Sequence, residues 1–204
     1  KNKKVLSIVG GIIVLLLLII LYYFFMYIPQ KEEDAQKQMF MAERYFEKEN
    51  WDKALNGDGN YPGFLKIIDD YSVTKAANLS NFYAGCCFLR LGKYDEAIKH
   101  FEEFDSDDMF LSSEAIGCIG DAYMEKGQTE EAIKYYIKAA NNNSNNFTSP
   151  FFLMKAAFAY EDIKNYEKAL EIYENIKKDY FKSSEAREVD KYISRVKELL
   201  GKDN

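Results

Sequence analysis

The stretch 56–63, with the sequence NGDGNYPG, carries the side chains that most resemble a metal-binding loop. Asn56, Asp58 and Asn60 alternate with other residues at the spacing of the first three ligands of a helix–loop–helix calcium site. Such a loop also needs glycine at its sixth position and glutamate at its twelfth, where this chain has Tyr61 and Ile67. Glycine and asparagine tolerate positive φ, and proline can open a helix, so we expect a turn and no metal site.

Groups that could perform catalysis are few. The only histidine, His100, falls on a predicted outer helix, where an isolated imidazole is more typical of a surface residue than of a base. The acidic string DSDDMF, residues 105–110, is expected to close one helix and cap the next. Nucleophile elbows, phosphate-binding loops and paired metal-binding histidines do not occur in the sequence. We therefore expect a protein that is not an enzyme, with no cofactor and no small-molecule substrate.

Three cysteines, Cys86, Cys87 and Cys118, leave two interpretations open. Neighbouring cysteines on a helix diverge by about 100°, so a bond between the first two would be strained. In one interpretation all three are small buried apolar residues. In the other, Cys86 and Cys118 form a bridge between neighbouring helices.

The elements that position these residues begin with an apolar segment. Residues 5–28 contain no charged side chain, and a helix of that length spans roughly 36 Å against a hydrocarbon core of about 30 Å. Tyrosine and phenylalanine gather at its end, as in the aromatic belt of a membrane interface. We expect a retained single-pass anchor; a cleaved signal peptide is the alternative, although its apolar core would be shorter. Ser7 and Gly11 form a small-xxx-small pair that either accepts another membrane helix or faces lipid.

The charges that flank this segment predict its orientation. Three lysines precede it, so residues 1–4 are expected in the cytoplasm and residues 29–204 outside it. All 33 acidic residues but only 24 of the 27 basic residues follow the segment. That acidic balance, without any run of lysine or arginine, excludes nucleic acid as a favoured partner.

Internal repeats predict the architecture of the remainder. The segments 83–101 and 118–136 share small residues, a turn glycine and a terminal ring at a spacing of 35 residues, and 155–173 repeats the pattern. Small residues let two antiparallel helices approach, and the ring fills the space beside them. Residues 172–180 match 63–71, which places a six-residue insertion within 56–63.

This pattern resembles the tetratricopeptide repeat, a helix, a tight turn and a second helix. We expect an all-α fold in which a transmembrane helix is followed by a helical solenoid of about four hairpins and a capping helix. The expected repeats are 35–77, 78–112, 113–149 and 150–183, with a cap at 184–200 in which Ser194 is the small residue.

In this repeat family the inner helices line a concave groove, and the resemblance transfers its positions to this chain. Apolar and acidic side chains there would suit an extended or helical polypeptide with apolar and basic side chains; alternatively, each one packs against a neighbouring repeat. The groove positions are Met39, Glu43, Phe46, Leu79, Phe82, Cys86, Leu89, Glu114, Gly117, Asp121, Met124, Phe151, Met154, Phe158 and Glu161.

The anchor, the acidic repeat domain and the sequence ALNGDGNYPGFLKIIDDY followed by TKAANLSNFYAG together resemble the YfgM-like proteins of the bacterial inner membrane, especially those of Bacteroidetes. This resemblance implies a periplasmic accessory of the SecYEG translocon that works with a PpiD-like chaperone on exported polypeptides. A structural scaffold of another envelope assembly, such as cell division or secretion machinery, is the alternative function. Both functions need a protein-binding surface, and neither needs catalysis.

Overall fold

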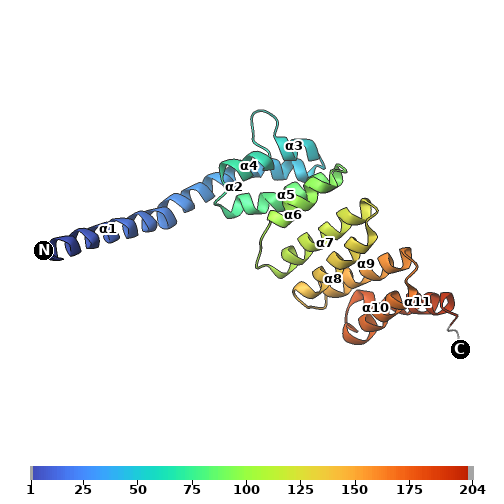
Figure 1. Ribbon diagram of the computed structural model, residues 1–204. Coiled ribbons are helices and arrows are strands. Elements are labelled where there is room, and N and C mark those ends of the chain that lie inside the picture. The colour runs from blue at the N-terminus through green and yellow to red at the C-terminus, as the bar shows by residue number, and fades with distance from the viewer. Residues whose placement is uncertain (1, 202–204) are drawn as a thin grey trace. The chain divides into compact units, whose positions relative to one another are not determined.

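The computed structural model describes residues 2–201, and this part of the chain contains helices and no strands (Figure 1). The first residue of the expected cytoplasmic flank lies outside that range. The chain divides into two compact units, Lys1–Ala84 and Gly85–Asn204. The elements are α1 (Asn2–Tyr22), the π-helical turn η1 (Tyr23–Tyr27), α2 (Ile28–Glu47), α3 (Trp51–Asn56), α4 (Phe64–Asp70), α5 (Lys75–Arg90), α6 (Tyr94–Glu103), α7 (Met109–Glu125), α8 (Thr129–Asn142), α9 (Thr148–Asp162), α10 (Tyr166–Asp179) and α11 (Ser184–Leu199).

The apolar segment runs into the first helix of the repeats without a break. Helix α1 continues through η1 into α2, so the connector between the apolar segment and the first repeat is itself helical (Figure 1). Pro29 lacks an N–H and its ring crowds the carbonyl four residues earlier, which a wider turn relieves. The N–H of Ile28 accordingly donates to the carbonyl of Tyr23, five residues back. Side chains 8–27 are exposed in the protein, and the segment is apolar and long enough to cross a membrane.

Two side chains at the start of α2 hold it against the rest of the first unit. The ammonium of Lys31 lies 6.0 Å from the ring centroid of Tyr27 and 5.2 Å from that of Tyr71. Glu32 Oε2 accepts from the backbone N–H of Lys75 at 2.6 Å, at the first turn of α5. A carboxylate is favoured there because the first N–H groups of a helix have no partner within the helix.

The insertion divides the second helix of the first repeat into α3 and α4. Asp58 organises the loop, because its Oδ1 accepts from the N–H groups of Asn60 and Tyr61, both at 2.9 Å. Tyr45 donates to Asp58 Oδ2 at 2.8 Å and so attaches the loop to α2. Gly63 is buried, and a Cβ there would lie 2.1 Å from the carbonyl oxygen of Leu55, so only glycine lets the two backbones meet. The oxygen side chain of Asp58 thus makes turn hydrogen bonds.

In the second unit, successive helices pack as antiparallel neighbours from α6 to α11. The turns use residues that reach positive φ: Gly92 at 72° and Gly127 at 70° end the inner helices of two hairpins. Asp108 caps α7 by accepting from the N–H groups of Phe110 and Leu111, both at 2.9 Å. The expectation that the acidic string caps a helix is therefore confirmed.

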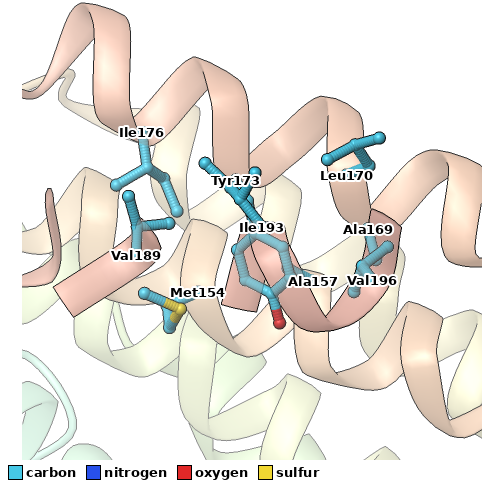
Figure 2. Close-up of a cluster of buried hydrophobic side chains, with 9 residues drawn as sticks. All are labelled: Met154, Ala157, Ala169, Leu170, Tyr173, Ile176, Val189, Ile193 and Val196. Carbon is cyan, nitrogen blue, oxygen red and sulfur yellow. The ribbon is translucent and has the colours of Figure 1, made fainter. Parts of the chain in front are cut away.

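Small residues and one buried ring form the core of each hairpin. At the end of the chain, Ala157 of α9 and Ala169 of α10 are fully buried beside Tyr173, and Val189 and Val196 of α11 close the cluster (Figure 2). Helix α11 thus covers the last hairpin. Ser194, the expected small residue of this helix, is exposed, because a capping helix has no second helix packed against that side.

Candidate protein-binding face

Two junctions in the second unit are each formed by a side chain from one inner helix, a ring fifteen residues later and a side chain from the next inner helix. Near the centre of the second unit, these groups are Asp121, Tyr136 and Lys155. At the cap they are Phe158, Tyr173 and Tyr192: ring centroids lie 5.1 Å apart for Phe158 and Tyr192 and 5.5 Å apart for Tyr173 and Tyr192. The same arrangement therefore holds an ionic contact at one junction and an aromatic contact at another.

The first unit contains the corresponding ring on the far side of the insertion. Phe64 stacks on Tyr83 with a centroid distance of 5.0 Å and an interplanar angle of 9°. Counting fifteen residues and six inserted residues from Glu43 leads to Phe64, so the insertion returns the chain to the repeat pattern. Phe46, an expected groove residue, is half-buried and packs edge-on against Trp51, Phe64 and Tyr83.

Two acidic side chains of the inner helices are already paired within the protein. Lys155 Nζ lies 2.7 Å from both carboxylate oxygens of Asp121, and Tyr136 donates to Asp121 Oδ1 at 2.6 Å. Burial, together with that carboxylate, raises the pKa of the Tyr136 hydroxyl, which keeps it a donor. The ammonium also lies over three rings, 5.2 Å from the centroid of Phe151. The hydrogen-bonding and charge requirements of Asp121 are therefore met within this chain, without a bound protein partner.

The same is true of the acidic side chain near the cap. Arg195 Nη2 contacts the two oxygens of Glu161 at 2.6 and 2.8 Å, and the hydroxyl of Tyr173 donates to Glu161 Oε1 at 2.5 Å. Burial and this carboxylate raise the pKa of Tyr173. Glu161 thus joins three helices, and Arg195 neutralises the charge that was expected to attract a basic partner.

The structure buries three of the expected groove residues. Met39 is 6% exposed, and Ser80 Oγ donates to its sulfur at 3.3 Å. Met154 is 9% exposed and belongs to the core beneath the cap. Gly117 is also buried, because the ring of Phe152 occupies the space above it. These three positions hold neighbouring repeats together and offer no surface to a partner.

The remaining expected positions are at least partly accessible. Half-buried positions are Glu43, Phe46, Leu79, Phe82, Cys86, Leu89, Asp121, Met124 and Glu161. Phe151 and Phe158 are 41% and 39% exposed on the same side of α9. In the apolar helix α1, Ser7 and Gly11 are exposed. A Cβ at Gly11 would meet no other atom within 4 Å, so another helix has room to approach this position.

Sequence reasoning missed two exposed phenylalanines at the beginnings of the inner helices. Phe110 is 49% exposed and Phe147 is 73% exposed, and their ring centroids lie 6.3 Å apart. The expected repeats began three residues later, at 113 and 150, and so left both out. Helical spacing would have found them, since 110 precedes 114 and 147 precedes 151 by four residues. We call Phe110, Phe147, Phe151 and Phe158 the phenylalanine face.

A carboxyl group with an altered pKa adjoins this face. Glu114 lies one turn after Phe110 on α7, and desolvation raises its pKa, although Lys155 opposes the shift. Its Oε1 accepts from Cys118 Sγ at 3.9 Å. The side chain itself is still open to solvent, so partial removal of water by the helix walls causes the shift.

The cysteines and the histidine are packed residues. All three thiols are free; Cys118 is buried, and the neighbouring Cys86 thiol, together with burial, raises the pKa of Cys118. Burial raises the pKa of Cys87 to about 12. His100 stacks on Phe88 with a centroid distance of 5.2 Å, and burial lowers its pKa. The histidine is thus more enclosed than the surface residue expected from the sequence.

Comparison with known proteins identifies the repeat. One tetratricopeptide-repeat family model matches residues 114–146, and a second matches 80–107 and 152–183. No curated protein sequence matches the chain.

Solved structures with a similar fold are low in sequence identity. One is a structure of TPR-like repeats described as those of a kinesin light chain from Podosopora anserina. Its sequence identity to this chain is 14% and the TM-score is 0.60, and the match covers 83% of this chain and 88% of that one. The MamA protein has 19% identity, a TM-score of 0.57, and coverage of 81% of this chain and 91% of its own. By its fold and its repeat matches, the chain contains an N-terminal apolar helix followed by a solenoid of tetratricopeptide repeats.

Proposed function

We propose that this chain is a membrane-anchored, non-enzymatic protein-binding module. The observation that carries the proposal is the phenylalanine face, four large apolar rings between 39% and 73% exposed on two inner helices. Exposed apolar surface of this kind marks sites of protein interaction, whereas a lone exposed ring would not. Tetratricopeptide repeats generally serve as scaffolds for protein interaction.

The face suits a polypeptide segment that is rich in apolar side chains. Its rings offer area for apolar anchors, while Asp121 and Glu161 are neutralised by Lys155 and Arg195 and add little attraction for a basic partner. Glu114 is the acidic group that remains beside the rings. The partner is thus selected mainly by apolar contact, with less weight on basic side chains than the sequence implied.

We further propose that residues 5–28 remain as a membrane anchor, with the N-terminus in the cytoplasm and residues 29–204 in the periplasm as the repeat domain. The continuity of α1, η1 and α2 supports retention, since the helix that enters the membrane also packs in the first repeat. An anchor raises the effective concentration of the binding face for partners at the same membrane. Protease treatment of intact spheroplasts should digest the repeats and leave the anchor; a mature chain that begins near residue 28 would contradict retention.

The resemblance to YfgM-like proteins narrows the partner to the SecYEG translocon and a PpiD-like chaperone, or to exported polypeptides. Affinity purification of the full-length protein in mild detergent, followed by mass spectrometry, tests this assignment. Enrichment of SecY and a periplasmic chaperone is expected. Enrichment of a dedicated cell-division or secretion assembly would instead support the structural-scaffold function.

The phenylalanine face is tested by a matched pair of variants. In F147S/F151S two exposed rings are removed from the face, and in I163S an apolar side chain of similar exposure is removed at the α9–α10 turn. The double variant should lose the co-purified partner while I163S retains it, with helix content by circular dichroism unchanged in both. Equal partner recovery from both variants would refute the face as the binding site.

A further inference from the structure

Cys86 and Cys118 occupy the position at which neighbouring inner helices meet elsewhere in the second unit. The ring at this junction is Phe101, fifteen residues after Cys86, as Tyr136 follows Asp121 and Tyr173 follows Phe158. Cys118 stands three residues before Asp121, as Lys155 stands three before Phe158. The corresponding contacts are the Asp121–Lys155 ion pair at 2.7 Å and the Phe158–Tyr192 ring pair. Repeat geometry therefore places the two thiols against each other.

The raised pKa of Cys118, to which the neighbouring Cys86 thiol and burial both contribute, agrees with this placement. Cys86 is half-buried and can be reached from solvent, while Cys118 is buried behind it. Cys87 is the natural comparison, because it neighbours Cys86 in sequence and is fully buried. In a two-step disulfide exchange the more accessible thiol reacts first with the oxidant, and the second thiol then displaces the oxidant from the mixed disulfide.

We propose that Cys86 and Cys118 are a modification site, at which a disulfide forms between the inner helices of two successive repeats. The bond takes the place that the ion pair and the ring pair hold at the other junctions. It converts a weak contact between thiols into a covalent one and limits movement of α7 relative to the end of α5.

The oxidant is a disulfide, either a small molecule or a thiol–disulfide oxidase. The thiolate of Cys86 attacks one sulfur of the oxidant and forms a mixed disulfide, which releases one thiol. The sulfur of Cys118 then attacks the sulfur of Cys86 and releases the second thiol. Two electrons and two protons pass from the cysteine pair to the oxidant, which leaves as two thiols.

Glu114 is placed to assist the second step. Cys118 must lose its proton to attack, and Glu114 Oε1 lies 3.9 Å from its sulfur. Desolvation makes this carboxylate a better proton acceptor than an ordinary one, because its pKa is raised. Glu114 is thus a positioning and proton-accepting residue whose loss should slow ring closure without preventing it.

The test uses the full-length C87A protein in detergent, which retains only the proposed pair of thiols. Incubation with oxidised glutathione at neutral pH should remove both free thiols, lower the mass by two hydrogens and join the tryptic peptides of Cys86 and Cys118. The oxidised form should melt roughly 5–15 °C above the dithiothreitol-treated form, because the bond closes a loop of about 32 residues. The variants C86S/C87A and C87A/C118S should show no such difference.

Either of two results would overturn the proposal. In one, the folded C87A protein keeps both thiols or carries stable glutathione adducts while circular dichroism shows native helix content. In the other, the linked peptides appear only after unfolding in urea. For Glu114, the E114Q/C87A protein should show a several-fold slower loss of the mixed disulfide at Cys86, and an unchanged rate would remove this residue from the step.

Discussion

Replacing Gly117 with alanine is expected to destabilise the second unit, although alanine is the better helix former. A Cβ at this position would lie 1.9 Å from Cε1 and 2.4 Å from Cζ of Phe152. The ring is 1% exposed and is packed among Ala132, Tyr136 and other core residues of α8 and α9. It cannot move aside without disturbing the packing of the next repeat.

The two opposing contributions can be weighed. Replacing glycine by alanine in a helix interior stabilises by about 1 kcal/mol. Overpacking a filled core costs roughly 1–3 kcal/mol, and an overlap with a buried ring belongs at the upper end of that range. The net loss is therefore about 1–2 kcal/mol, which corresponds to a fall in melting temperature of roughly 2–8 °C for a chain of this size.

Thermal unfolding followed by circular dichroism should rank three glycine variants by their contacts. G117A should melt lowest; G120A, whose Cβ would lie 2.6 Å from Tyr136, should follow; and G85A, at 2.8 Å from Phe101, should be least affected. The double variant G117A/F152L should regain stability relative to F152L alone, because the smaller side chain makes room for the Cβ. A melting temperature of G117A at or above that of the native chain would refute this account of the packing.

Three further predictions concern single side chains. Burial lowers the pKa of His100 from 6.5, so the stability that its neutral form contributes is present above that pH and is lost as the pH falls. The H100Q variant should therefore show a flatter decline in melting temperature between pH 7 and pH 5. A decline identical to that of the native chain would contradict this prediction. K155M should cost about 1 kcal/mol in urea unfolding, and a double-mutant cycle with D121N should show coupling, whereas additivity would mean that the ion pair contributes nothing. D58A should loosen the insertion loop and speed the amide hydrogen exchange of Asn60 and Tyr61, whose N–H groups donate to Asp58. Exchange rates in α7 serve as the internal reference, and unchanged rates at Asn60 and Tyr61 would show that other contacts hold the loop.

The helical hairpins and their turns were predictable because their determinants are local. A small residue and a ring recur at one spacing, and each hairpin uses the same positions to bring its two helices together. The helix cap at Asp108 follows from its place just before an apolar run. The apolar segment is visible as an uninterrupted run of apolar residues, and the insertion as a change in spacing.

The accessibility of the inner-helix residues was not predictable in the same way. Leu79 and Phe151 occupy the same position in their repeats, yet Leu79 is half-buried and Phe151 is exposed. Asp121 and Glu161 likewise appeared available to a partner, while each is paired with a base 34 residues later. These outcomes depend on how far each repeat turns relative to the next.

By itself the sequence determined the repeat type, the positions of the helices and the length of the apolar segment, because spacing and hydrophobic pattern act within one hairpin. Only the tertiary structure decided which side chains form the phenylalanine face and which carboxylates are neutralised. Such contacts join residues more than thirty positions apart, and their partners are set by the stacking of one repeat on another, which no local pattern encodes.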